Sequence, residues 1–529
     1  MHRSHAKTMN MNTRTSVASF LLLFGAVQCS TRPNFVLMFA DDFGWGDVGA
    51  NWAETKETPN IDRLATSGIR FTDFHAGASV CTPSRAALLT GRLGLRTGVV
   101  QNFGVLSQYG LPLNETTLAE MLKATGYSTG MIGKWHLGIN GSYHPNHRGF
   151  DFYYGLPYSN DMGCVDDPGY NLPMCLPCPK KSDATLRDLF QEEAAINCDR
   201  WSDAVPLFHN LDIIEQPADL NTLSNRYAQM ADSFISNQTS DTPFFLYVAF
   251  AHMHVPQNHD PKYTNASTRK TIFADTLLEM DTTVGVILDS LRRNGFTNDT
   301  LVLFTGDNGP WEEKCNLTGS PGSYLGLWEK RHSNGSSSKR TTWEGGHREP
   351  GIVSWPGMIK PRVSNALVSA LDVFPTFGKL AGASLPVYRM FDGLDISHVL
   401  FNGSEKGHDF LVHPNSGGSG GAGDLDTLRK GDWKLMYQTG GVASCNRLSP
   451  PAIRHDPPLL FNLINDEQES EALDVTEEPY SQILIEMTKL LEQVKESVSK
   501  DNTTVAEYKK NSDDRPCCNR NNVVCRCTV

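Results

Sequence analysis

Charged and amide side chains follow four apolar segments of the chain, at the point where each segment ends. The four endings read Asp41-Asp42, Gly133-Lys134-Trp135-His136, Ala251-His252-Met253-His254 and Asp307-Asn308. In open α/β sheets, ligands bind in the crevice beyond the carboxyl ends of the strands. One such ending has an ordinary explanation, because Asp and Asn often begin loops and helices. Four of them together predict a polar ligand site.

Four of these side chains, Asp41, Asp42, Asp307 and Asn308, offer only oxygen atoms as ligands. Oxygen ligands suit a hard cation, Ca²⁺ or Mg²⁺, rather than zinc. Without a cation between them, the three carboxylates would repel one another. The alternative is structural, with a helix cap and a turn. The sequence therefore predicts a site for one of these two cations.

The segment from Cys81 to Arg92 is the strongest local signal in the chain, and it reads Cys-Thr-Pro-Ser-Arg-Ala-Ala-Leu-Leu-Thr-Gly-Arg. Thr82 can cap a helix that Pro83 begins, which places Cys81 at a helix N-terminus. The partial positive charge there favours anions. The site could hold a sulfate or a phosphate, or it could activate a thiolate. A buried structural Cys is the alternative.

Apolar runs that alternate with helical patterns must position these residues. Buried strands are predicted at residues 35–40, 129–132, 244–250 and 301–304, and helices at residues 117–124 and 272–293. This alternation predicts an α/β fold with a mixed, mainly parallel sheet between helices.

The pattern changes near residue 385, which predicts a catalytic domain over residues 30–385 and a smaller C-terminal α+β domain over residues 386–529. The smaller domain should hold an antiparallel sheet and a Cys-rich tail. Its strands are predicted at residues 433–437 and 459–463, and an amphipathic helix at residues 481–498. Residues 156–220 of the catalytic domain are irregular and rich in Cys and Pro, which indicates an insertion held by disulfides.

Residues 1–29 are typical of a signal peptide. Arg3, Lys7 and Arg14 precede an apolar run at residues 17–27 that is too short to span a bilayer, and cleavage is expected after Cys29. No later segment predicts a membrane span. On the secretory route, the nine Asn-x-Ser/Thr sites become possible glycan acceptors. They are Asn114, Asn140, Asn237, Asn265, Asn298, Asn316, Asn334, Asn402 and Asn502.

The chain has twelve Cys, and loss of Cys29 with the signal peptide leaves eleven. An odd number indicates one thiol with a separate role. Zinc is an alternative for Cys175-x-x-Cys178, but an oxidising compartment favours disulfides. We predict a long-range Cys315–Cys445 bridge. The tail cysteines are expected to pair among themselves, namely Cys517, Cys518, Cys525 and Cys527.

The net charge of −12 and the pI near 5.7 argue against a nucleic-acid partner, because no Lys/Arg-rich run is present. An acidic chain approaches neutrality as the pH falls. Its charge is therefore compatible with an acidic compartment.

The Cys81 segment resembles the active-site motif of the sulfatase family, in which a dedicated formylglycine-generating enzyme oxidises the Cys to formylglycine. The resemblance runs from Asn34 to the C-terminus. It also includes the segments at residues 40–47, 133–138 and 339–346. It implies an alkaline-phosphatase-like fold and hydrolysis of sulfate esters.

The resemblance assigns roles to the residues that bind the cation and the sulfate. The implied Ca²⁺ ligands are Asp41, Asp42, Asp307 and Asn308, together with the formylglycine made from Cys81. Arg85 resembles the residue that steadies the formylglycine. Lys134 and Lys339 resemble the lysines that bind the sulfate.

The resemblance also implies two catalytic histidines. His136 is similar to the histidine beside the formylglycine hydroxyls, and His254 to the one that serves the leaving oxygen, with His252 as the competing candidate. Ser159 resembles a sulfate-binding serine. Asn160 departs from the His found in a related family member.

The closest resemblance within the family implies a sulfated glycosaminoglycan as substrate, specifically the 3-O-sulfated glucosamine of heparan sulfate, with aryl sulfates as side substrates. It also implies delivery to the lysosome through the secretory pathway, with partial secretion possible. Mannose-6-phosphate receptors would recognise the N-glycans.

Four other functions compete with this interpretation. A phosphatase or phosphodiesterase of the same superfold would need a Ser or Thr nucleophile and His/Asp zinc ligands. A Cys-dependent phosphatase needs more residues between Cys and Arg than the three that separate Cys81 from Arg85. A secreted protein that binds sulfated glycans without catalysis would not need the full set of polar residues. A sulfatase for another sulfated glycan or for a sulfolipid is also compatible with the motifs.

Overall fold

A computed structural model describes residue 1 and residues 32–180, 203–501 and 504–527. The predicted signal peptide, Cys198 and the sequon at Asn502 lie outside the described residues. Among the described helices, none is both long and apolar enough to cross a membrane.

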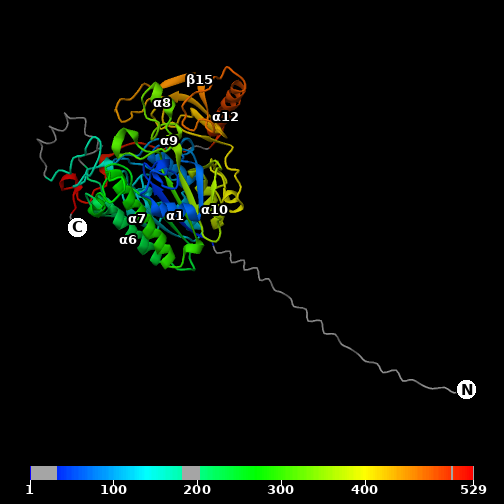
Figure 1. The fold of residues 1–529 in the computed structure, drawn as a ribbon. Helices are drawn as coiled ribbons and strands as arrows, with labels where there is room; N and C mark the ends of the chain where they lie inside the picture. Colours follow the sequence, from blue (N-terminus) through cyan, green and yellow to red (C-terminus); the bar gives the residue numbers. More distant parts are fainter. Residues whose placement is uncertain (2–31, 181–202, 502–503, 528–529) are drawn as a thin grey trace. The chain divides into compact units, whose positions relative to one another are not determined.

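Five parallel strands form the centre of the larger sheet (Figure 1). Their order is β8 (Thr300–Gly306), β1 (Asn34–Ala40), β7 (Phe244–Ala249), β3 (Ser128–Gly133) and β4 (Phe152–Gly155). All four strands that the apolar runs predict are confirmed. Their residues are almost entirely buried, as expected for strands covered on both faces.

Helices cover both faces of this sheet, because side chains alternate along each strand. Phe35, Leu37 and Phe39 of β1 belong to a core that includes residues of α2 (Cys81–Thr90), α4 (Leu118–Ala124) and α10 (Val373–Ala381). Val36 and Met38 point the other way. They belong to a core with α1 (Pro59–Ser67), α6 (Leu223–Ser236) and α7 (Ile272–Arg293). The helices predicted at residues 117–124 and 272–293 are confirmed.

Antiparallel strands extend the sheet at both edges. Beyond β8 lie β9 (Arg348–Ser354) and β2 (Ile69–His75), each antiparallel to its neighbour, and β2 also pairs in parallel with two short strands, β10 (Arg362–Ser364) and β11 (Val368–Ser369). Beyond β4 lies a hairpin of β5 (Leu207–His209) and β6 (Asp212–Glu215). The prediction of an irregular segment up to residue 220 is wrong for this hairpin, whose Leu207 and Phe208 are buried against the sheet.

A second sheet of four antiparallel strands lies in the C-terminal part of the chain. Its strands are β12 (Phe410–Val412), β13 (Thr427–Lys430), β14 (Trp433–Thr439) and β15 (Ile453–Asn462). Helix α12 (Tyr480–Lys500) packs on this sheet through Met487, Leu491 and Val494. The two strands and the amphipathic helix predicted for this region are confirmed.

Disulfides connect the loops, and the predicted pairings are confirmed. The bridges are Cys164–Cys178, Cys315–Cys445, Cys517–Cys525 and Cys518–Cys527. Cys175 is also disulfide-bonded, which excludes the zinc alternative for Cys175-x-x-Cys178. Of the cysteines that the structure describes, only Cys81 is free.

Candidate active site

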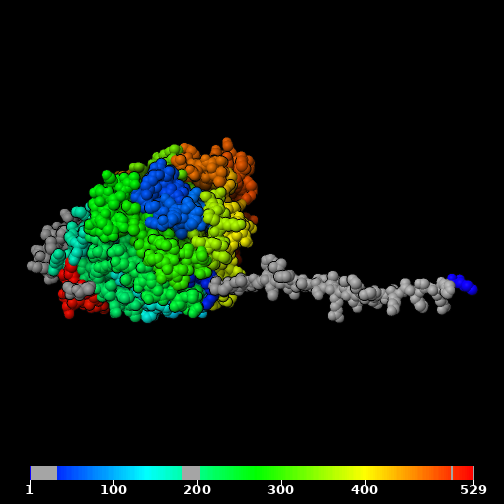
Figure 2. All heavy atoms as spheres, turned by 60° about the horizontal axis from the view of Figure 1, so that its bottom comes forward, coloured from blue at the N-terminus to red at the C-terminus, as the bar shows by residue number. Residues whose placement is uncertain are grey.

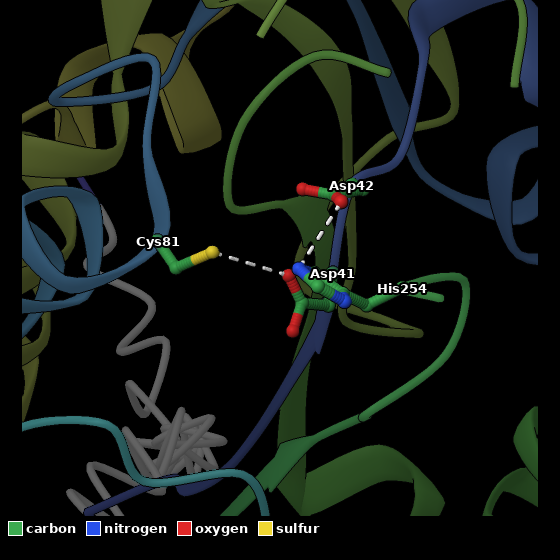
Figure 3. Close-up of side chains that lie close together, drawn as sticks. All are labelled: Asp41, Asp42, Cys81 and His254. Atoms are coloured by element: carbon green, nitrogen blue, oxygen red, sulfur yellow. Dashed lines mark hydrogen bonds and ion pairs between the residues drawn. The ribbon is translucent and has the colours of Figure 1, made fainter. Parts of the chain in front are cut away.

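The four predicted strand endings meet at one edge of the central sheet. Strands β8, β1, β7 and β3 are neighbours and parallel, so their carboxyl ends lie side by side. Asp41 and Asp42 follow β1, and His254 comes from the loop after β7. Figure 3 shows both carboxylates with Cys81 and His254 converging on one point. One ligand atom from each of these four residues lies within 4.8 Å of all the others.

The acidic side chains of the site are buried and connected to one another. The Asp42 backbone N–H donates to Asp307 Oδ1 at 3.1 Å, and Asn308 Nδ2 donates to Asp42 Oδ1 at 2.8 Å. Asp41, Asp307 and Asn308 are fully buried. Asn308 Oδ1 has no hydrogen-bond partner among the described residues. An amide oxygen left free beside three carboxylates suits a cation with oxygen ligands.

Three buried cations offset these carboxylates. Arg85 Nη2 lies 2.7 Å from Asp307 Oδ2, Lys339 Nζ lies 2.5 Å from Asp42 Oδ1, and Lys134 Nζ pairs with Asp41. Burial alone would raise the pKa of Asp41, but the charges of Lys134 and Arg85 lower it below its ordinary value. Burial and the Asp41 charge raise the pKa of Asp307 to about 7. Asp307 is therefore the least stabilised of these carboxylates, and a divalent cation beside it would favour its charged form.

Cys81 begins helix α2, and its sulfur lies 3.6 Å from Asp41 Oδ1. The predicted capping by Thr82 is wrong, because Val80 occupies the cap position and the Thr82 hydroxyl donates instead to the carbonyl of His136 at 2.8 Å. Burial and the Asp41 charge raise the pKa of the Cys81 thiol. The unmodified thiol is therefore neutral, which argues against the thiolate alternative.

The two histidines differ in which ring nitrogen is bonded to a backbone carbonyl. His254 Nδ1 lies 2.6 Å from the Val255 carbonyl, so it carries the proton and donates, while Nε2 accepts from Lys339 Nζ at 3.2 Å. His136 Nε2 lies 3.1 Å from the Phe103 carbonyl, and its buried Nδ1 has no partner among the described residues. Burial and Lys134 lower the pKa of His136, so its ring is neutral.

His252, the competing candidate, faces a different part of the molecule. Its Nε2 lies 3.9 Å from Glu279 of helix α7, and burial lowers its pKa to about 4. His252 is not among the four residues whose ligand atoms cluster, whereas His254 is. The geometry therefore favours His254 as the histidine of the site.

A pocket of about 600 Å³ opens above these residues. His254, Lys339 and Ser159 line it, as the resemblance implies for a sulfate site. Asn160 does not. Its amide nitrogen donates to the carbonyls of His254 and Pro256 at 3.2 and 3.1 Å, so it supports the loop that carries His254.

Several pocket residues could not be recognised from local sequence. Trp311 contacts His254, with 5.5 Å between ring centroids, and its ring faces Lys339 Nζ at 4.3 Å. Arg340, Tyr508 and Lys510 line the mouth. No motif or spacing marks these four residues, apart from the place of Arg340 directly after Lys339.

Two family models match the chain. The model described as "Sulfatase" matches residues 33–383, and the model described as "C-terminal region of aryl-sulfatase" matches residues 406–527. The chain belongs to the sulfatase family. It is a sulfuric ester hydrolase, and its two sheets form the alkaline-phosphatase-like fold that the resemblance implies.

Named relatives agree with this assignment. The sulfatase is 51% identical to Arylsulfatase G of Homo sapiens over 499 residues, which cover 94% of this chain and 93% of the relative. It is 39% identical to Arylsulfatase A of Homo sapiens, with 85% of each chain covered. The crystal structure of the PsFucS1 sulfatase from Pseudoalteromonas sp. superposes with a TM-score of 0.75 at 27% identity, covering 90% of this chain and 92% of that one.

Proposed function

We propose that this sulfatase uses residue 81, oxidised from Cys to formylglycine, together with one Ca²⁺ bound by oxygen atoms. The observation that carries the proposal is the position of Cys81. Its sulfur is free, buried and neutral, and it lies 3.6 Å from Asp41 within the cluster of acidic side chains. A neutral buried thiol is a poor nucleophile, so a chemical change at this position accounts for the site better than an unmodified Cys.

The proposed Ca²⁺ ligands are Asp41, Asp42, Asp307 and Asn308, with residue 81 completing the set. The free Asn308 Oδ1 and the raised pKa of Asp307 support this assignment. When bound, the cation would supply a positive charge beside the sulfate oxygens.

The lysines and Ser159 bind the sulfate in this proposal. Lys134 and Lys339 are fully or almost fully buried, so their charges act in a medium where electrostatic stabilisation is strong. Arg85 remains paired with Asp307 and holds the first turn of α2 in place. The formylglycine hydrate would supply two hydroxyls on one carbon, one for attack on sulfur and one for the later release of sulfate.

His254 acts as the general acid and His136 as the base. His254 Nε2 faces the pocket and lies beside Lys339 Nζ, so a second proton taken up at this nitrogen would be in place for the leaving alcohol. His136 keeps a free lone pair on Nδ1, because its Nε2 is directed to the Phe103 carbonyl. Proton transfer by a positioned side chain typically contributes about 10²–10⁴-fold in rate.

The proposed substrate is the 3-O-sulfated glucosamine of heparan sulfate, with small aryl sulfates as side substrates. Identity of about half the residues with Arylsulfatase G over nearly the whole chain supports this choice. We further propose activation by a formylglycine-generating enzyme, and delivery to the lysosome through mannose-6-phosphate receptors and the secretory pathway.

Release of sulfate from defined heparan sulfate fragments at acidic pH tests the substrate. We expect release from fragments with a terminal 3-O-sulfated glucosamine, and little from fragments sulfated only at another position. Release from another sulfated glycan or a sulfolipid alone would replace the proposed substrate. Binding without any release would indicate a non-catalytic glycan-binding protein.

A further inference from the structure

A segment near the C-terminus, residues 504–511, forms part of the wall of the pocket. We call it the strap. It lies against the mouth loop, residues 98–108. The end of the chain beyond the strap, drawn in red in Figure 2, packs on the segment after β6, where Cys527 N donates to the Gln216 carbonyl at 2.9 Å. The strap is thus fixed beside the pocket although it is about 400 residues from Cys81 in sequence.

Hydrogen bonds along its length join the strap to the mouth loop. The Tyr508 hydroxyl accepts from the backbone N–H groups of Val100 and Gln101 at 2.9 and 3.1 Å. Further along, Gln108 N donates to the Lys509 carbonyl at 3.0 Å, and Lys510 pairs with Ser107 as an antiparallel bridge. These contacts hold Lys510 at the mouth of the pocket.

Two cations at this mouth have no partner. Among the described residues, neither the Arg340 guanidinium nor the Lys510 ammonium makes a hydrogen bond or an ion pair, and both side chains line the pocket. The neighbouring Lys509 differs, because its ammonium pairs with Glu507 at 2.8 Å. Uncompensated cations at the entrance of a pocket attract anionic ligands, and the net charge of −12 makes this local positive charge notable.

The two acids that also line the pocket have other partners there than Arg340 and Lys510. Asp161 lies 3.9 Å from His254 Nδ1, and Glu313 accepts from Trp311 Nε1 at 3.3 Å. A volume of about 600 Å³ lies in the range of sites that enclose a whole small-molecule ligand, so the pocket has room for more than a sulfate group.

We propose that Arg340 and Lys510 form a second anion subsite, which binds a carboxylate or sulfate group on the sugar next to the one that is desulfated. The proposal rests on the proposed glycan substrate and extends it. Lys134 and Lys339 bind the reacting sulfate, and the strap supplies a cation for the neighbouring charge. Arg340 and Lys510 are therefore expected to determine specificity without acting in the chemical step.

The test compares Lys510→Ala with Lys509→Ala, which removes the same charge from the same strap outside the pocket. Substrates are a small aryl sulfate with one anionic group and a sulfated oligosaccharide with a second anionic group on the next sugar. An exposed ion pair contributes enough to change KM by about two- to fivefold. We expect Lys510→Ala to raise KM for the oligosaccharide by this factor with kcat nearly unchanged, and the double variant with Arg340→Gln to raise it further.

The source of the second charge is identified with matched oligosaccharides. If reduction of the neighbouring carboxyl group abolishes the difference between the two strap variants, the subsite binds a carboxylate. If removal of a neighbouring sulfate abolishes it, the subsite binds a sulfate. Equal KM values for Lys510→Ala and Lys509→Ala on every oligosaccharide would overturn the proposal.

If the proposed glycan is not a substrate, the unaltered enzyme will release no sulfate from the oligosaccharide. This result differs from the one expected if only the subsite is wrong. The subsite is in that case tested through inhibition of aryl sulfate hydrolysis by the same oligosaccharide. Lys510→Ala should raise the inhibition constant about two- to fivefold. An unchanged constant would contradict the subsite.

Discussion

The position of the proton on each histidine determines what the residue can do. His254 donates through Nδ1 to the Val255 carbonyl, which leaves Nε2 for the pocket. His136 is held the other way round by the Phe103 carbonyl, which leaves Nδ1 free. Each ring therefore keeps one nitrogen without a proton, Nε2 of His254 and Nδ1 of His136, so His254 has to take up a proton before it can act as the acid, whereas His136 can accept one directly.

His254→Ala should lower kcat by about 10²–10⁴-fold for alkyl or sugar sulfates, because the leaving oxygen then has no proton donor. The loss should be smaller for an aryl sulfate whose leaving phenol is acidic, since that oxygen needs less help. His252→Ala serves as the control, because His252 faces Glu279. This variant should lower kcat by less than about tenfold. Steady-state kinetics on both substrate types measures the effect, and equal losses for the two variants would argue against the assignment.

Cys81→Ser should prevent turnover after the first half of the reaction. A serine hydroxyl can attack sulfur, but it lacks the second hydroxyl on the same carbon that is needed to expel sulfate. The variant should therefore accumulate a covalent sulfate ester at position 81, visible by peptide mass spectrometry as one added SO₃ group. Normal turnover by this variant would exclude the hydrate mechanism.

At the scale of elements, a buried ionic network joins the four-stranded C-terminal sheet to the chain segment that follows Lys339. Lys434 of β14 is fully buried and lies 3.1 Å from Glu344 of helix α9 (Glu344–His347) and 2.7 Å from Glu469. Glu344 also pairs with Arg348 and Arg429. Helix α9 lies shortly after Lys339 in the chain, so this network connects the C-terminal sheet to a lysine of the pocket.

Lys434→Met should lower the free energy of unfolding by about 3–5 kcal/mol, because it leaves two buried carboxylates with less compensation. Lys430→Met is the matched control on the adjacent strand. Lys430 pairs with Glu486, and both side chains are substantially exposed, so the loss of Lys430 should change the free energy of unfolding far less than the loss of Lys434. Denaturant unfolding of the two variants checks the difference. Similar stabilities would show that the buried network contributes little.

For the whole molecule, the sequence predicts which chain segments meet at the candidate site, because strands determine their places. Asp41, Lys134, His254 and Asp307 follow strands that can be recognised from their apolar runs, and parallel strands bring their ends together. The strap could not be predicted in this way. Tyr508 contacts Val100 across 408 positions, and no local pattern encodes such a contact.

Residue types also predict the wrong local structure where tertiary contacts compete with local ones. Thr82 has the residue type of a helix cap, yet its hydroxyl donates to the His136 carbonyl, and the helix begins at Cys81 instead of Pro83. The β5–β6 hairpin lies in a segment whose Cys and Pro content indicates irregular structure. Its short strands form because the edge strand β4 is available for pairing.

Removal of the cation should affect the whole enzyme, because a ligand that binds only the folded state stabilises it. We expect chelation to lower the Tm by a few degrees and to abolish activity, and added Ca²⁺ to restore both. Asp41→Asn should lose the response of the Tm to Ca²⁺, since it removes a charged ligand. A Tm and an activity that chelators leave unchanged would contradict a cation in this site.

Peptide mass spectrometry of position 81 in the active enzyme tests the central claim most directly. The account predicts formylglycine at this position, with a specific activity proportional to the modified fraction across preparations. Full activity from protein in which Cys81 carries an unmodified thiol would contradict it.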